Sequence, residues 1–333
     1  MDPSVVFPIK LHIHNSTDLG PVFQVTKERW RGSVKKFPEI KERLVVTFSE
    51  DDEGLDKYLP QADVLFCWDF DKKDFKKRAP NLKWIHIHGA GVSHLRPFDW
   101  LSEGIILTNS RGVHGERAAE YVMMAVLMLN NRIPEMVNNQ MNAKWEQLFN
   151  TSVVGKTLLI FGVGSVGGSA AKLAKQFEMT VLGIRRSGAG ADGVDAMHKP
   201  GELKRLLPEA DFVLITAPYT TETDQIFGAV EIDLLKSGAG LINYSRAGLV
   251  DYNALQKRLI KREITAVLDV FDPEPLPQDS TLWSTPNLII TPHCSSDDRE
   301  LYTPKTLDLV LSNLSNWING KEIINRVNIE REY

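Results

Sequence analysis

Three side chains that can bind a carboxylate and move a proton, Arg246, Glu274 and His293, each follow a short apolar segment in the second half of the chain. If these segments are parallel strands of one sheet, their carboxyl ends share an edge, and we expect the three side chains to lie at that edge. The three segments are residues 240–244, 264–269 and 287–291.

This combination of residue types suits reversible hydride transfer at a carbonyl that stands next to a carboxylate. Arg246 would hold the carboxylate of the acid and polarise its carbonyl. His293 would give a proton to the carbonyl oxygen as the hydride arrives, and Glu274 would stabilise the imidazolium. Each residue also has a structural alternative: Arg246 could pair with a surface carboxylate, Glu274 could be a solvated turn residue, and His293 could cap a loop.

A glycine-rich turn, Gly162-Val163-Gly164-Ser165-Val166-Gly167, lies in the middle of the chain between two apolar segments of strand length. A helical pattern separates the turn from the second apolar segment. Strand, Gly-x-Gly-x-x-Gly turn, helix and strand in this order are the context of a dinucleotide-binding fingerprint, in which the pyrophosphate lies at the start of the helix. The alternative is a plain structural turn, because the glycine pattern alone has low specificity.

The residues after the second strand of this motif indicate which nicotinamide dinucleotide binds. An NAD-selective site has an acidic residue there, which binds the ribose 2′-hydroxyl. This chain has Arg185, Arg186 and Ser187 instead, and these match a 2′-phosphate in charge and geometry. We therefore expect NADP to be preferred, with NAD possible. The alternative is a solvated basic turn in an enzyme that is indifferent to the phosphate.

The composition excludes several classes of protein. The chain has 333 residues, a formal net charge of −4 and 43% hydrophobic residues, which are ordinary values for a globular protein of two domains. The chain has no excess of positive charge that would indicate a nucleic-acid partner. No apolar segment approaches the length of a membrane span. With only two cysteines, Cys67 and Cys294, and no signal-peptide pattern, we expect a reduced, cytoplasmic protein.

Apolar segments of strand length alternate with helical patterns along the whole chain, which predicts an α/β fold with parallel sheets. In the first third, the expected strands are residues 9–13, 44–48, 62–67, 82–88 and 105–108. Residues 115–131 form the longest helical pattern, and their apolar side chains nearly encircle the helix. Such a helix must be buried on all sides, either as an interdomain core helix or as a homodimer interface.

Four further motifs add to the glycine turn, and together they extend over residues 84–293. They are Trp84-Ile-His-Ile-His-Gly89-Ala-Gly-Val92, Asn243-Tyr-Ser-Arg246, Leu268-Asp-Val-Phe-Asp-Pro-Glu274 and Thr291-Pro-His293. In this order the motifs resemble those of the D-isomer-specific 2-hydroxyacid dehydrogenases. The resemblance implies that Arg246, Glu274 and His293 are the catalytic residues. It also implies a glyoxylate or hydroxypyruvate reductase-like activity on a small 2-ketoacid, and a homodimer built on the helix at 115–131.

The resemblance further implies two doubly wound parallel-sheet domains. A flavodoxin-like substrate domain is expected at 1–110 and 297–333, and a Rossmann dinucleotide-binding domain at 111–296, with closure of the two domains excluding water. Substrate-binding residues are expected at His88, Gly89, Ala90 and Gly91 in addition to Arg246 and His293. The remaining cofactor-binding residues are expected at Thr216, Ala217, Pro218, Tyr244, Ser245 and Asp269, of which Asp269 would contact the nicotinamide carboxamide.

Several features leave alternatives open. Ala247 follows Arg246 where the family usually has glycine, and Cys294 next to His293 could be a reactive thiol or a buried inert side chain. His86 and His88 alternate on one face, but without a third ligand we expect no metal site. Trp145 could reach a substrate pocket or serve packing. A dinucleotide-sensing regulator on the same fold is the alternative function, and a formate- or phosphite-oxidising relative is a third.

Overall fold

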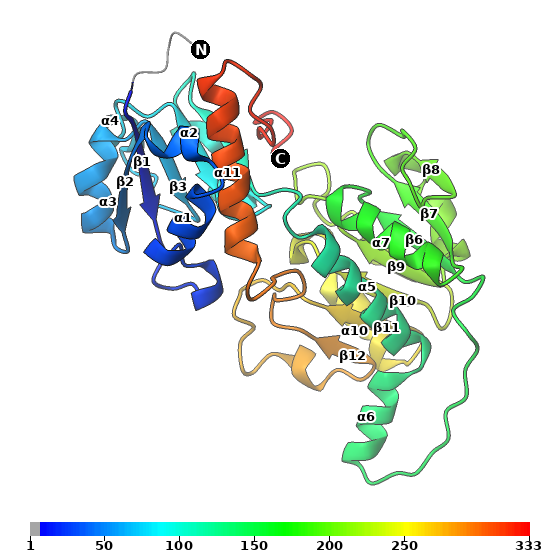
Figure 1. Ribbon diagram of the computed structural model, residues 1–333. Coiled ribbons are helices and arrows are strands. Elements are labelled where there is room, and N and C mark those ends of the chain that lie inside the picture. Colours follow the sequence, from blue (N-terminus) through cyan, green and yellow to red (C-terminus); the bar gives the residue numbers. More distant parts are fainter. Residues whose placement is uncertain (1–6) are drawn as a thin grey trace. The chain divides into compact units, whose positions relative to one another are not determined.

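The computed structural model describes residues 7–333, and the chain divides into two compact units (Figure 1). The first comprises Met1–Val113 and Asp298–Tyr333, and we call it the split unit. The second comprises His114–Asp297, and we call it the continuous unit. The chain therefore passes between the units twice, where the sequence predicts domain boundaries near residues 110 and 297.

The split unit is built on a five-stranded parallel sheet, in the order β2-β1-β3-β4-β5. This is the flavodoxin-like strand order, and each strand lies over a segment that the sequence predicts. The strands are β1 (Ile9–His14), β2 (Leu44–Ser49), β3 (Val64–Cys67), β4 (Trp84–Ile87) and β5 (Ile106–Asn109).

Helices from both ends of the sequence complete the core of the split unit. Helix α11 (Tyr302–Ile318) packs beside α1 (Lys27–Val34), as Figure 1 shows in red and blue. The buried face of α11 includes Leu307, Leu314 and Trp317, which join the same core as the side chains of β1. Shorter helices are α2 (Pro38–Lys41), α3 (Asp52–Tyr58) and α4 (Phe75–Arg78).

The continuous unit is built on a seven-stranded parallel sheet, in the order β12-β11-β10-β9-β6-β7-β8. The order reverses between β6 and β9, as in a Rossmann fold, and ligands of such sheets bind outside the carboxyl ends at this reversal. The strands are β6 (Thr157–Phe161), β7 (Thr180–Ile184), β8 (Ala196–His198), β9 (Phe212–Ile215), β10 (Gly240–Asn243), β11 (Thr265–Leu268) and β12 (Leu288–Ile290). The fold class expected from the sequence is confirmed, although β8 was not predicted.

Helices α5 (Gly115–Asn130) and α7 (Ser165–Gln176) pack side by side in the continuous unit (Figure 1). A Cβ on Gly115 would lie 2.8 Å from the Ser169 hydroxyl, so the helices meet closely at this point. The sequence predicts a helix buried on all sides, but within this chain α5 buries one face, and Met124 on the other face is 40% exposed. Helix α7 begins inside the glycine turn, at Ser165.

The remaining helices of the continuous unit are α6 (Ile133–Met141), α8 (Leu203–Leu206), α9 (Ala229–Asp233) and α10 (Tyr252–Ile260). Helix α6 was not predicted, and it extends away from the sheet of its unit (Figure 1). Among residues 7–333, the structure contains no helix with the length and apolar character that crossing a membrane requires.

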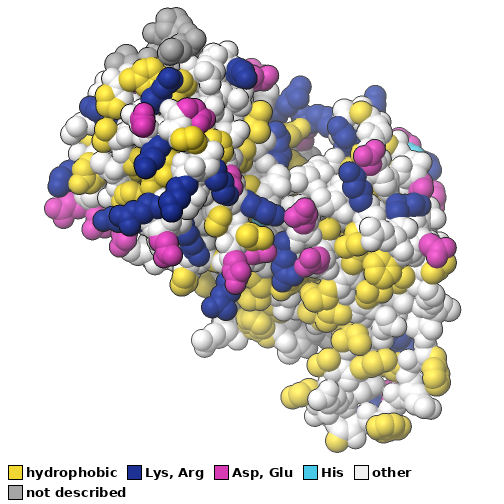
Figure 2. Space-filling model, viewed as in Figure 1, with side chains coloured by type: hydrophobic (Ala, Val, Ile, Leu, Met, Phe, Trp, Pro, Cys, Tyr) yellow, Lys and Arg dark blue, Asp and Glu magenta, His cyan; other side chains and the backbone are white. Residues whose placement is uncertain are grey.

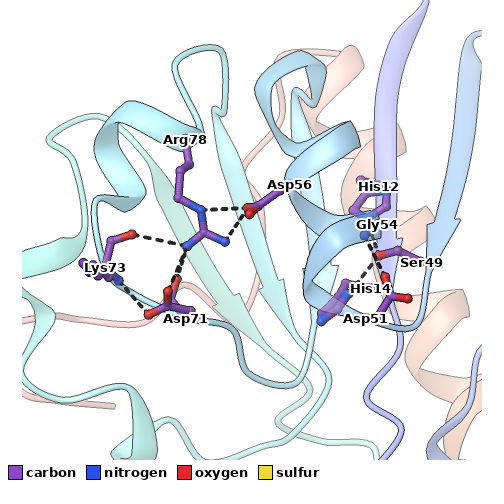
Figure 3. Close-up of polar contacts among 9 residues, drawn as sticks. All are labelled: His12, His14, Ser49, Asp51, Gly54, Asp56, Asp71, Lys73 and Arg78. Carbon is purple, nitrogen blue, oxygen red and sulfur yellow. Dashed lines mark hydrogen bonds and ion pairs between the residues drawn. The ribbon is translucent and has the colours of Figure 1, made fainter.

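A buried histidine pair lies at the carboxyl ends of β1 and β2 (Figure 3). The Ser49 hydroxyl lies 2.8 Å from both His12 Nε2 and His14 Nδ1, and the Thr47 hydroxyl lies 2.8 Å from His12 Nδ1. Burial, together with the neighbouring His14, lowers the pKa of His12 to about 4. Burial also lowers the pKa of His14, against the attraction of Asp52 and Asp51. Both imidazoles are therefore neutral in the folded protein at neutral pH.

The histidine pair predicts acid destabilisation of the split unit. Because His12 binds a proton more readily in the unfolded chain, its contribution to stability is complete above the unfolded pKa of 6.5 and is lost as the pH falls toward 4. From His12 alone we expect the free energy of unfolding to fall by about 2 kcal/mol between pH 7.5 and pH 5. Urea unfolding at both pH values measures this loss. In the His12→Gln variant, most of the fall in the free energy of unfolding that comes from His12 should be absent. If the variant loses as much free energy of unfolding between the two pH values as the unaltered protein, His12 is not the cause.

Candidate active site

The glycine turn follows β6 directly, and two of its glycines are required by the surrounding backbone. Gly162 has φ +108°, and a Cβ there would lie 2.2 Å from the Ala217 amide nitrogen. A Cβ on Gly167 would lie 2.5 Å from the Gly162 carbonyl oxygen. Both positions exclude any larger residue, because the atoms that a side chain would meet belong to the main chain.

The third glycine faces open space at the start of a helix. Gly164 is the N-cap of α7, it makes no side-chain cap hydrogen bond, and nothing lies within 4 Å of a Cβ built on it. Ser165, Val166 and Gly167 form the first turn of the helix, whose N–H groups point along the axis toward the cap. Open space in front of an uncapped helix start fits a pyrophosphate, which such a terminus attracts.

The segments after β9 and β10 lie against the glycine turn. The Thr216 hydroxyl donates to the Gly162 carbonyl over 2.8 Å, and the Ser245 hydroxyl donates to the Ala217 carbonyl. Pro218 accepts a hydrogen bond from the Thr223 hydroxyl over 2.8 Å. The structure thus brings Thr216, Ala217 and Ser245, which are expected to bind the cofactor, to the edge of the sheet that carries the fingerprint.

The basic residues after β7 are partly engaged with one another and with a neighbouring loop. Arg185 Nε donates to the Ser187 hydroxyl over 2.9 Å. Arg186 forms an ion pair with Glu222, with 2.6 Å between Nη2 and Oε2. Arg185 and Ser187 therefore lie together after β7, whereas Arg186 has an acidic partner that the sequence did not indicate.

His293 lies in a tightly held loop after β12. Its backbone has φ +47°, in the left-handed region that only glycine adopts readily. The carboxylate of Asp269, which is 1% exposed, accepts hydrogen bonds from the hydroxyls of Thr291 and Ser295, both over 2.6 Å, and from two main-chain N–H groups. Asp269 thus fixes the loop on either side of His293, and both of its oxygens have protein partners.

Glu274 orients the ring of His293. The Oε2 atom of Glu274 lies 2.6 Å from His293 Nδ1, and Oε1 accepts the Phe271 N–H over 2.7 Å. Burial alone would raise the pKa of Glu274, but the hydrogen bonds from His293 and Phe271 outweigh it and hold the pKa below its usual value. An ionised carboxylate can only accept, so Nδ1 must carry a proton, and Nε2 is the ring atom that can exchange one.

Arg246 is held next to these residues by the turn after β10. Its Nη1 donates to the Ser245 carbonyl over 2.6 Å, and the Asn243 side chain donates to the Arg246 carbonyl over 3.0 Å. Burial lowers the pKa of Arg246, while the carboxylates of Glu274 and Asp269 oppose that shift. A half-buried arginine close to two carboxylates keeps a fixed positive charge near His293.

A contact between a neutral histidine and an aspartate lies at the far end of the His293 loop. His114 Nδ1 lies 3.2 Å from the Ser296 carbonyl and 3.6 Å from Asp297 Oδ1. Burial raises the pKa of Asp297 to about 6; the charge of His293 opposes this shift and that of Asp269 adds to it. Burial lowers the pKa of His114. This pair has no signature in the sequence, because its members are far apart in the chain.

Aromatic side chains line the other side of the loop. Tyr244 contacts Tyr121 edge to face, and the Tyr121 hydroxyl lies 4.0 Å from Cys294 Sγ. Burial raises the pKa of the Cys294 thiol, so the thiol stays protonated near neutral pH. A protonated thiol favours an inert role for Cys294 over a reactive one, because the nucleophilic form of cysteine is the thiolate.

The expected substrate-binding segment after β4 belongs to the split unit. The Gly89 carbonyl accepts the Ser110 N–H over 3.0 Å, and the Ala90 carbonyl accepts the Asn109 side chain over 2.8 Å. The His88 ring is buried and stacks on Tyr302. His86 is fully buried between the hydroxyls of Thr108 and Ser110.

The part of the chain that the structure describes contains no group of three or more His, Cys, Asp or Glu side chains placed to hold a metal.

The continuous unit alone brings together Arg246, Glu274 and His293, beyond the carboxyl ends of three neighbouring strands. With the glycine turn at the reversal of strand order, this arrangement defines an oxidoreductase that acts on CH–OH groups with a nicotinamide dinucleotide.

Residues 123–295 match the family model described as D-isomer specific 2-hydroxyacid dehydrogenase, NAD binding domain. The chain therefore belongs to the D-isomer-specific 2-hydroxyacid dehydrogenase family, as its motifs predict.

Three relatives illustrate the breadth of the similarity. The chain is 35% identical over 237 residues to glyoxylate/hydroxypyruvate reductase B of Pectobacterium atrosepticum, covering 68% of this chain and 73% of the relative. It is 30% identical to D-3-phosphoglycerate dehydrogenase of Methanocaldococcus jannaschii over 92% of this chain, but it spans only 60% of that longer protein. The crystal structure of a family member from Xanthobacter autotrophicus, in complex with NADPH and MES, has a TM-score of 0.84 and 25% identity, covering 98% and 100% of the two chains.

Proposed function

We propose that this protein reduces a small 2-ketoacid, such as glyoxylate or hydroxypyruvate, with NADPH. The dinucleotide, when bound, supplies the hydride. His293 donates the proton to the carbonyl oxygen through Nε2, Glu274 stabilises the imidazolium through Nδ1, and Arg246 binds the substrate carboxylate. In the oxidation direction His293 takes the same proton back.

The contact of 2.6 Å between His293 Nδ1 and Glu274 Oε2 carries this proposal. A carboxylate that fixes the tautomer of a partly exposed histidine is the arrangement that a general acid–base requires. A histidine that merely caps a loop is the structural alternative. Such a histidine would not need a carboxylate that a main-chain N–H holds in position. The reductase name of the Pectobacterium relative supports the substrate class.

Backbone N–H groups of Gly89, Ala90 and Gly91 are proposed to receive the substrate carboxylate, since small residues allow close approach of a ligand to the main chain. The carbonyls of Gly89 and Ala90 are both held by hydrogen bonds, which fixes the segment. His88 would act through its buried ring as a support for this segment. Val92, the next residue, packs into the core of the split unit.

The oxidation of NADPH and NADH with glyoxylate, hydroxypyruvate, pyruvate and a bulkier phenyl ketoacid tests the proposed activity. We expect NADPH oxidation with at least one of the small ketoacids. An absence of turnover with all four, together with tight dinucleotide binding, would refute the reductase and favour a dinucleotide-sensing role.

The cofactor preference rests on Arg185, Arg186 and Ser187, and a single reversal of charge tests it. We expect Arg185→Asp to weaken the binding of NADPH by about 100-fold, because a carboxylate would replace a direct partner of the 2′-phosphate. NADH binding should change by less than about threefold. Isothermal titration with both dinucleotides makes the comparison. Similar losses for both would assign Arg185 a structural role.

We also propose that the protein is a homodimer, with α5 and the segment that follows it as the interface. This segment, residues 133–154, exposes Met141 by 80%, Trp145 by 94% and Phe149 by 82%. Figure 2 shows apolar side chains gathered over α6 and the residues beyond it. Large apolar side chains clustered on one exposed segment are typical of an interaction surface, and a second copy would cover them together with Met124.

Replacing the two most prominent aromatic residues tests the dimer. We expect the double variant Trp145→Glu, Phe149→Glu to raise the dimer dissociation constant by about 100-fold, because buried aromatic side chains dominate interface energies. Light scattering coupled to size-exclusion chromatography gives the oligomeric state. Trp283→Glu is the matched control, since Trp283 is 53% exposed in another part of the unit. A monomeric unaltered protein would refute the proposal.

A further inference from the structure

The ion pair between Arg186 and Glu222 connects two loops that flank the glycine turn. Strand β6 lies between β7 and β9 in the sheet, and the glycine turn leaves its carboxyl end. Arg186 comes directly after β7 and Glu222 lies in the loop after β9, yet their side chains approach to 2.6 Å. The pair therefore joins the loops on either side of the position at which a Rossmann sheet binds its dinucleotide.

The carboxylate is presented by a turn with its own internal bonds. The Thr220 N–H donates to the Thr223 hydroxyl over 2.8 Å, and the Thr223 hydroxyl donates to the Pro218 carbonyl over 2.8 Å. At the end of the same turn, the Gln225 N–H donates to the Gly248 carbonyl over 2.7 Å. Glu222 thus stands on a fixed loop, although its own side chain is 72% exposed.

The two arginines of the turn differ in their partners. Arg185 donates to the neutral hydroxyl of Ser187, whereas the charge of Arg186 is balanced by a carboxylate. A phosphate dianion that approaches these side chains must displace Glu222 from Arg186 or bind close to its negative charge. A ribose 2′-hydroxyl carries no charge and meets neither cost.

We propose that Glu222 is a specificity-determining residue, which competes with the 2′-phosphate of NADPH for Arg186 and so limits the preference for NADPH over NADH. The proposal rests on the proposed use of NADPH. Glu222 weakens NADPH binding selectively, and the ratio of the two dinucleotide affinities reports its effect. Because both side chains lie at the surface, the ion pair contributes little to the free energy of unfolding.

The experiment compares Glu222→Gln with the unaltered protein by isothermal titration of NADPH and NADH, and of the fragments 2′,5′-ADP and 5′-AMP. We expect Glu222→Gln to bind NADPH and 2′,5′-ADP about threefold to tenfold more tightly, and to leave NADH and 5′-AMP unchanged. Glu209→Gln is the matched control: Glu209 forms an exposed ion pair with Arg205 in the same unit. In an Arg186→Ala background the effect of Glu222→Gln should disappear.

Three results would overturn the proposal. If the unaltered protein binds both dinucleotides and Glu222→Gln leaves their ratio unchanged, Glu222 does not act on the phosphate, and the proposed function stands. If Glu222→Gln weakens NADH, the carboxylate is an acceptor for the ribose hydroxyl, which is the opposite role. Failure of the unaltered protein to bind either dinucleotide would instead remove the proposed function together with this inference.

Discussion

Replacement of His293 with alanine is expected to lower kcat by about 10³-fold and to leave the dissociation constant of the dinucleotide within about twofold. The reason is geometric. Only Nε2 of His293 is free of the bond that holds the ring to Glu274, and the loop around it is fixed by Asp269. Loss of the imidazole removes the proposed proton donor but not the glycine turn, which lies after another strand. Steady-state kinetics and titration of the dinucleotide separate the two effects.

His198→Ala is the matched control for this substitution. His198 also contacts a carboxylate, with 3.0 Å between its Nδ1 and Glu202, and it lies in the same unit, but it belongs to strand β8. We expect this variant to retain its kcat. Equal turnover in the unaltered protein and His293→Ala would exclude His293 from the reaction, whatever the variant's stability.

Alanine substitutions at two glycines of the turn after β6 are expected to differ in their effects. One should lower the stability of the protein, and the other should weaken dinucleotide binding. Gly162→Ala places a Cβ against the Ala217 backbone at a φ of +108°, so we expect the free energy of unfolding to fall by more than about 3 kcal/mol. Gly164→Ala meets nothing within 4 Å, so stability should change by less than about 1 kcal/mol. The added methyl group should instead weaken dinucleotide binding by about tenfold or more, because we propose that the pyrophosphate approaches at this point.

Urea unfolding without ligand measures the first effect, and titration of the dinucleotide measures the second. Each variant is the control for the other, since both add one methyl group to the same turn. A Gly164→Ala variant that binds as tightly as the unaltered protein would show that no phosphate passes close to this residue.

The strands and the edge that carries the chemistry could be predicted from the sequence, since both depend on local patterns. Short β-branched and apolar segments predict the strands, and the topology of parallel sheets then places the residues after them at one edge. This reasoning brings Arg246, Glu274 and His293 into one unit without any structural information. Helix α6 and strand β8 were missed because α6 has few buried side chains and β8 has three residues.

The contacts that support the site could not be predicted, because they form between segments that are distant in the sequence. Asp269 was expected to contact the nicotinamide, but the structure shows that it also holds Thr291 and Ser295. Glu222 carries no sequence signal at all, since it reaches Arg186 only after β9 has been placed beside β6. Single charged residues in loops are too frequent for their partners to be inferred from residue type.

The return of α11 to the first sheet has a consequence for the order of events during synthesis. Leu307, Leu314 and Trp317 share a core with β1, so the split unit cannot complete that core until the residues of α11 have left the ribosome. The continuous unit contains all of its own strands and can fold earlier, because domains generally fold as units while translation proceeds. While residues 114–297 are being synthesised, strands β1–β5 therefore expose an apolar sheet face that a chaperone could cover.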